Sequence, residues 1–267
     1  AALLSSAGLN APEVFAHDVD SGFMMLKDLG EDLYFDKLSD TNQIEQLYQD
    51  AFVALAKMQQ ISATLDPYDE VLLQDEMSLF PDWFLSRQLD IDCAPELLEE
   101  VFGLMIANAS SQPQVFVHRD YHCRNLMIAQ PNPGIIDFQD AVIGPITYDL
   151  VSLLKDCYHK FPVDQIERWV MEYRARLVIA GLLEASVSEA TFRRWFDFMG
   201  FQRHLKCAGI FSRLNLRDGK PGYLADIPLV LQYLSEVCER YTELKPFGSW
   251  LQEVVVPRMD STEYVRR

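Results

Sequence analysis

The chain has 267 residues, 49% of them hydrophobic, so it can bury a sizeable core as one large domain or two small ones. Its formal net charge of -17 argues against a nucleic-acid partner, because neutralising phosphates requires clustered Lys and Arg. The sequence has no apolar run of about 18 residues, which argues against a membrane span, and its first residues lack the basic flank of a signal peptide. We therefore expect a cytoplasmic protein.

The five cysteines are widely spaced, and no two of them form a Cys-x-x-Cys pair. This pattern predicts reduced thiols rather than a disulfide framework or a zinc site.

The first part of the chain predicts a short helix and a hairpin. Residues 1–7 are typical of the last turns of a helix, which Gly8 would terminate. Residues 13–17 and 23–26 are apolar runs on either side of a turn signal, and they predict two paired strands.

Helical periodicity dominates most of the remaining chain. Apolar residues recur at steps of three and four over residues 41–60, which predicts a helix with one buried stripe and an N-cap at Asp40 or Thr41. We also predict a short helix opening at residues 81–85, and further helices over residues 94–110, 147–158, 163–183, 188–211, 224–241 and 248–256. We find no internal repeat and no linker that would divide the chain.

The central stretch predicts short strands with polar residues at their ends. Residues 115–117, 126–129 and 134–137 are apolar runs, and the last two flank a Pro-rich turn at residues 130–133. We interpret Gly144 and Pro145 as a turn.

The segment between the first two of these strands reads HRDYHCRN and matches the pattern H-R-D-x-x-x-x-N, while DFQ at 137–139 stands where D-F-G would be. In phosphoryl transfer a carboxylate accepts the hydroxyl proton, and hard oxygen donors hold Mg²⁺ on the nucleotide phosphates. The spacing predicts Asp120 as the base, and Asn125 and Asp137 as metal ligands. The alternative is that both aspartates only cap turns, but the two motifs in this order make it a minor possibility.

The stretch resembles the aminoglycoside phosphotransferase and choline kinase-like family, whose loop typically reads H-G-D-x-H-x-x-N and is followed by I-D-F or I-D-W. The longer strings HRDYHCRNLM and IIDFQDAVIGPITYDLVSLLKDCY are most similar to bacterial anomeric sugar kinases, and the similarity covers most of the chain. Arg119 replaces the usual Gly. The residues that match the loop pattern are His118, Asp120, His122 and Asn125.

The resemblance implies an α+β, protein kinase-like fold. Residues 1–30 would be the end of a small nucleotide-binding lobe and its hinge, and residues 31–267 a large catalytic and acceptor-binding lobe. Backbone groups of Leu26 and Asp28 would then meet the adenine of ATP. Loop or substrate support is expected from a further set of residues, with Asp149 bracing the catalytic loop: His118, Arg119, His122, Asp140 and Asp149.

A kinase small lobe should also carry a Gly-rich phosphate loop and a strand Lys, and neither precedes Ala1. We expect that a segment upstream of Ala1 supplies them. The rival expectation is a naturally truncated pseudo-enzyme.

One basic cluster stands out from the acidic background. Arg203 and Lys206 share a face of a predicted helix, and that face would hold the lactyl carboxylate of N-acetylmuramate by charge-assisted hydrogen bonds. The alternative is a solvated face paired with some of the 40 acidic residues.

The sequence therefore predicts a small-molecule kinase that uses ATP and Mg²⁺. The resemblance implies transfer to the anomeric C1 hydroxyl of N-acetylmuramate and/or N-acetylglucosamine, in cell-wall sugar recycling. Two alternatives stay open: phosphorylation of an aminoglycoside or another hydroxyl compound, and a non-catalytic kinase-like binding domain. The sequence leaves the oligomeric state open.

Overall fold

The computed structural model describes residues 1–92 and 94–261, which divide into two compact units. Unit 1 consists of residues 1–67, 113–156 and 161–192, and unit 2 of residues 68–112, 157–160 and 193 onward. Residues 1–30, expected to end a small lobe, lie in unit 1 together with residues 31–67. The lobe boundary at residue 30 stays a prediction.

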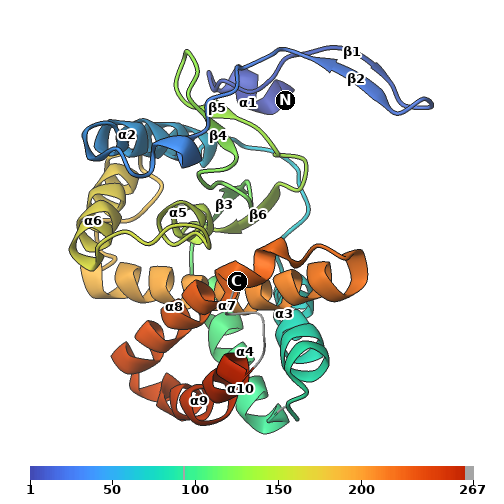
Figure 1. The fold of residues 1–267 in the computed structure, drawn as a ribbon. Helices are drawn as coiled ribbons and strands as arrows, with labels where there is room; N and C mark the ends of the chain where they lie inside the picture. The colour runs from blue at the N-terminus through green and yellow to red at the C-terminus, as the bar shows by residue number, and fades with distance from the viewer. Residues whose placement is uncertain (93, 262–267) are drawn as a thin grey trace. The chain divides into compact units, whose positions relative to one another are not determined.

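The described part of unit 1 contains three two-stranded antiparallel sheets (Figure 1). Strand β1 pairs with β2, β3 with β6, and β4 with β5 across the Pro-rich turn, so both predicted hairpins are confirmed. The strands are β1 (Val14–Asp18), β2 (Phe23–Leu26), β3 (Gln114–Val117), β4 (Leu126–Met127), β5 (Gly134–Ile135) and β6 (Val142–Pro145).

The helices of unit 1 follow the predicted periodicity. Helix α1 ends before Gly8, whose φ of +71° is the left-handed conformation that glycine adopts without strain. Asp40 caps α2 by accepting hydrogen bonds from the backbone N–H groups of Asn42 and Gln43. The helical elements of unit 1 are α1 (Ala2–Ser6), a 3-10 turn η1 (Tyr34–Lys37), α2 (Thr41–Met58), α5 (Tyr148–Leu154) and α6 (Val163–Ile179).

The apolar stripe of α2 is buried against α6. The rings of Tyr48 and Trp169 stack with centroids 4.8 Å apart, and Phe52 packs on Tyr173 at 5.6 Å. The Tyr173 hydroxyl donates to Gln59 Oε1 at 2.8 Å, so the polar end of this buried ring is satisfied. This packing confirms the predicted stripe as core.

Two predictions for unit 1 were wrong. Gly144 and Pro145 do not form a turn but end β6, which pairs with β3. Pro145 is tolerated there because it is the last residue of β6. In a two-stranded sheet each strand has an unpaired edge, so the missing N–H of Pro145 removes no hydrogen bond between β3 and β6. The helix predicted over residues 147–158 ends at Leu154.

In the described part of unit 2, the regular secondary structure is helical (Figure 1). Helix α3 was not predicted, and it continues into a π-helical segment in place of the short helix expected at residues 81–85. Helix α7 runs to Asp218, beyond the predicted end at residue 211, because no helix breaker occurs before Gly219. The elements are α3 (Glu70–Leu79), η2 (Phe80–Gln88), α4 (Pro95–Ser110), α7 (Glu189–Asp218, in unit 2 from residue 193), η3 (Pro221–Asp226), α8 (Ile227–Arg240), η4 (Thr242–Leu244), α9 (Lys245–Trp250), η5 (Leu251–Val255) and α10 (Val256–Ser261).

The structure also addresses the expectations about membrane-spanning helices and disulfides. Within residues 1–92 and 94–261, none of the helices combines the length and apolar character needed to cross a membrane. The cysteines that the structure describes form no disulfide, whereas Cys93 lies outside the described residues.

Candidate active site

The predicted catalytic loop connects β3 to β4 and is folded back on itself by its own backbone. The N–H of His122 donates to the carbonyl of Asp120 at 3.1 Å, and the N–H of Asn125 donates to the carbonyl of His122 at 2.9 Å. The N–H of Ile136, just after β5, then donates to the carbonyl of Asn125 at 3.2 Å. These bonds hold the loop against the strand that leads to Asp137.

The three residues predicted to carry the chemistry converge at Asn125. Its amide Nδ2 donates to the backbone carbonyl of Asp120 at 3.0 Å and to Oδ2 of Asp137 at 3.2 Å. With Nδ2 bonded to two oxygens, Oδ1 is the atom of this amide that a cation would take. Asp120 is half-buried and Asp137 is exposed, so both carboxylates lie at the surface of unit 1.

The donor set fits Mg²⁺. This cation prefers oxygen ligands and is usually held by one or two carboxylates together with waters and substrate phosphates. Asp137 and Asn125 supply a carboxylate and an amide oxygen on facing elements. The described residues contain no group of three or more His, Cys, Asp or Glu that would hold a metal without help from a substrate.

Asp149 lies directly beneath the loop. It is fully buried in the first turn of α5, where its Oδ2 accepts from the N–H of His118 at 2.7 Å and its Oδ1 from the N–H of Arg119 at 3.0 Å. Arg119 has a φ of +76°, a conformation that costs a residue with a side chain roughly 1–2 kcal/mol. The carboxylate of Asp149 therefore fixes a backbone turn for which the related loops use glycine.

His118 is buried, and its ring bonds in two directions. The N–H of Asp120 donates to Nδ1 at 3.3 Å, and Nε2 lies 3.1 Å from the carbonyl of Ile136. These partners require a neutral ring protonated on Nε2. Desolvation by burial lowers the pKa of His118 to about 4, which agrees with the neutral form. The ring ties the catalytic loop to the strand before Asp137.

The remaining residues predicted to support the loop or the substrate are Arg119, His122 and Asp140. Nη1 of Arg119 points toward the carbonyl of Asp140 at 3.5 Å, which is long for a hydrogen bond. Asp140 is exposed, and His122 is buried within the loop. Their roles stay predictions.

Two contacts in this region were missed by sequence reasoning. The Cys123 thiol donates to Oδ2 of buried Asp156 at 2.9 Å, and burial raises the pKa of this thiol. The side chain of Gln139 donates from Nε2 to Oδ1 of Asp137 at 2.6 Å. Gln139 stands where the D-F-G motif has a glycine. This departure was the sequence signal that could have indicated a side-chain contact with Asp137.

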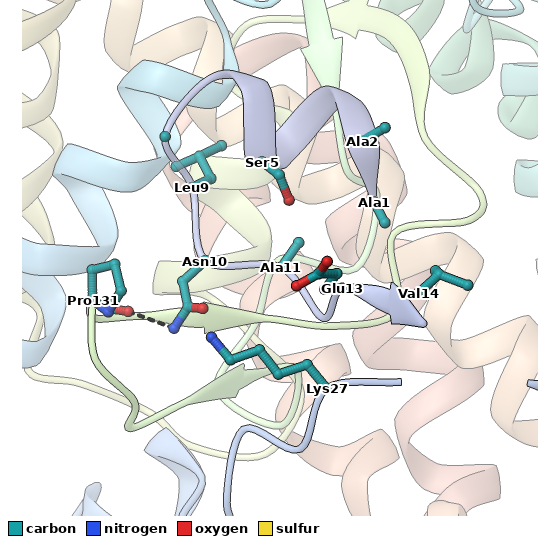
Figure 2. A pocket seen from close by; sticks show the side chains of 11 residues that line it. Ala1, Ala2, Ser5, Leu9, Asn10, Ala11, Glu13, Val14, Lys27 and Pro131 are labelled. Carbon is teal, nitrogen blue, oxygen red and sulfur yellow. Dashed lines mark hydrogen bonds between the residues drawn. The ribbon is translucent and has the colours of Figure 1, made fainter. Parts of the chain in front are cut away.

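The predicted hinge residues lie beside a cavity of about 580 Å³ in unit 1. Lys27, which lies between Leu26 and Asp28, lines this cavity, and its N–H donates to the carbonyl of Glu13 at 2.8 Å. Figure 2 shows Lys27 and Asn10 facing the cavity, with the Asn10 amide bonded to the Pro131 carbonyl at 2.7 Å. The contact of Leu26 and Asp28 with adenine stays a prediction.

Arg203 and Lys206 are interior residues of unit 2. They are only 5% and 9% exposed, so the alternative of a solvated face was wrong, although Lys206 is paired with an acid as that alternative expected. Nζ of Lys206 lies 2.8 Å from Oε1 of buried Glu76. Arg203 donates to the sulfur of Cys207 at 3.3 Å. Neither contact tests the predicted role in carboxylate binding.

This chain belongs to the phosphotransferase enzyme family, whose profile matches residues 1–185. It is 43% identical over 257 residues to the N-acetylmuramate/N-acetylglucosamine kinase of Pseudomonas putida, an alignment that covers 94% of this chain and 75% of the relative. The protein of the same name from Neisseria meningitidis is 39% identical over 257 residues, covering 92% of this chain and 76% of the relative.

Solved structures show the same kinase-like α+β fold. The choline kinase LicA from Streptococcus pneumoniae superposes with a TM-score of 0.61 at 14% identity, covering 88% of this chain and 78% of that one. An ADP-bound aminoglycoside phosphotransferase superposes with a TM-score of 0.53 at 17% identity, covering 85% and 76%. At these identities the likeness concerns the fold, and the predicted fold class is confirmed.

Proposed function

We propose that this protein is an ATP-dependent sugar kinase that phosphorylates the anomeric C1 hydroxyl of N-acetylmuramate and/or N-acetylglucosamine. The observation that carries the proposal is the convergence of Asp120, Asn125 and Asp137 through the two hydrogen bonds of the Asn125 amide. Relatives that align over most of the chain carry the name of such a kinase.

Asp120 accepts the proton of the sugar hydroxyl as the hydroxyl oxygen attacks the γ-phosphorus of ATP, while the bond from that phosphorus to the β,γ-bridging oxygen breaks and ADP leaves. A positioned carboxylate suits this role because the attacking alcohol must lose its proton without free hydroxide. Asn125 and Asp137 would hold Mg²⁺, which supplies charge neutralisation on the transferred phosphoryl group. Asp149 and His118 keep the loop in the shape that presents Asp120.

Leu26 and Asp28 would offer backbone groups to the adenine edge of ATP. The ADP-bound state of a structural neighbour supports nucleotide use in this fold. The acceptor is a free amino sugar, and we place the reaction in cytoplasmic recycling of cell-wall sugars.

A steady-state assay with N-acetylmuramate, N-acetylglucosamine and kanamycin as separate acceptors tests the proposal. The expected result is phosphorylation of at least one of the two sugars, with the phosphate on C1 by NMR. Turnover with kanamycin alone would contradict the proposed acceptor, and failure with all three would favour a non-catalytic domain.

Replacing the base tests the mechanism. Asp120→Asn should lower kcat by about 10²–10⁴-fold, because the alcohol loses its proton acceptor. The matched control is Asp164→Asn, which changes an exposed aspartate in the first turn of α6 and should leave kcat unchanged. A kcat for Asp120→Asn equal to that of the control would reject the role of Asp120.

A further inference from the structure

The metal-facing carboxylate of Asp137 is held from two sides. Oδ2 accepts from the Asn125 amide at 3.2 Å, and Oδ1 accepts from the Gln139 amide at 2.6 Å. Asp137 is exposed, so burial does not fix the direction of its side chain. The two amides are the interactions that set its direction.

We infer that Gln139 is a positioning residue that orients the Asp137 carboxylate for the divalent cation, and this inference rests on the proposed function. A carboxylate has about four lone-pair sites on its two oxygens. One amide donor on each oxygen leaves one site on each oxygen for a cation. Gln139 and Asn125 thus stop the carboxylate from rotating without occupying the sites that a metal needs.

The two donors differ in their relation to the metal: Asn125 is a predicted ligand, whereas Gln139 is predicted only to orient the Asp137 carboxylate. Asn125 is itself a predicted ligand, so its amide serves the metal as well as Asp137. Gln139 lies two residues after Asp137 and donates to its carboxylate from Nε2. Hydrogen-bond partners behind a metal ligand are typically worth 10- to 100-fold in metal affinity.

The test measures cation binding directly, apart from turnover. Electron paramagnetic resonance follows free Mn²⁺ during titration of the whole protein in the presence of ADP. Gln139→Met has a similar length and no donor, and it should weaken Mn²⁺ binding about tenfold. Gln130→Met is the matched control, since Gln130 is an exposed glutamine in the turn between β4 and β5, and it should bind Mn²⁺ as the parent protein does.

Turnover provides a second readout. If Gln139 positions the ligand, excess Mg²⁺ should restore the kcat of Gln139→Met, whereas a general loss of fold would not respond to the cation. Mn²⁺ affinity within twofold of the parent protein would overturn the inference, and so would an equal loss in the Gln130 control. Asp120→Asn should bind Mn²⁺ normally, so a failure of the proposed base is distinguishable from a failure of the role of Gln139.

Discussion

Two antiparallel strand pairs in unit 1 have similar apolar sequences and opposite environments. Every residue of β1 and β2 is exposed, including Phe23 at 75%. In β3 the residues 115–117 are all buried, and Phe116 is only 3% exposed. The local pattern therefore specifies a strand in both cases, while burial depends on which elements pack against it.

The difference in burial separates the strand pair that leads to the predicted catalytic loop from the pair that leads to the predicted hinge. The buried pair β3–β6 leads directly into His118 and Asp120, and the loop that follows is tied down by Asp149. The exposed pair leads into the predicted hinge at Leu26 and Asp28. The predicted catalytic loop thus starts from a buried strand pair, which we expect to open less often than the exposed pair.

The largest expected effect comes from breaking the buried pair. Phe116→Ala should lower the free energy of unfolding by about 4 kcal/mol, because truncating a buried Phe loses transfer energy and leaves a cavity. Phe23→Ala, the matched change on the exposed pair, should shift it by no more than about 0.5 kcal/mol. Urea denaturation measures both, and equal losses in the two variants would contradict the contrast.

The pH dependence of stability also distinguishes the two strand pairs, because the buried strand β3 is followed directly by the buried His118. The unfolded chain protonates this histidine near pH 6.5, whereas the folded chain does so only at about pH 4. The unfolded state therefore binds more protons between these values, and stability falls as the pH falls from 6.5 toward 4. Between pH 7 and pH 4.5 we expect His118 to account for a loss of about 2–3 kcal/mol in the free energy of unfolding.

The check compares urea denaturation of the parent protein and His118→Gln at the two pH values. Glutamine cannot protonate in this range, so the variant should lose about 2–3 kcal/mol less of its free energy of unfolding than the parent over this interval. Parallel pH profiles would show that His118 is not held neutral by burial.

The smallest expected effect concerns the strained turn after β3. Arg119→Gly should raise the free energy of unfolding by about 0.5 kcal/mol, because relief of the left-handed strain exceeds the entropy that glycine gains in the unfolded chain. Arg119→Ala removes the same guanidinium and keeps the strain, so it is the control. Thermal denaturation that ranks Ala above Gly would argue against strain at this position.

The sequence predicted elements whose signals are local. Alternating or continuous apolar runs located β1 to β5, and the stripe at steps of three and four located α2. The sequence missed β6, because Gly144 and Pro145 locally resemble a turn and only pairing with β3 makes them a strand. It missed the end of α5 because helix boundaries depend on tertiary packing as well as on propensity. It also missed the full length of α7, although the lack of a helix breaker between residue 211 and Gly219 was a local signal for the longer helix.

For the site, motif spacing predicted that Asp120, Asn125 and Asp137 would act together, and two hydrogen bonds of the Asn125 amide connect them, while their catalytic and metal-binding roles stay predictions. It did not reveal the burial of Arg203 and Lys206, since helical periodicity shows that two residues share a face without showing what that face contacts. Gln139 and Asp156 were missed because a hydrogen bond to a neighbouring carboxylate leaves no periodic trace in the sequence.

The position of Asp149 has a consequence for protein engineering. The turn at Arg119 is specified by a carboxylate thirty residues downstream, which reaches back to two amide groups. Residues 118–125 therefore do not determine the turn at Arg119 on their own, although hydrogen bonds within the segment shape the rest of the loop. A graft of this octapeptide onto a foreign scaffold would have to bring the first turn of α5 with it, or the transplanted loop would relax to another shape.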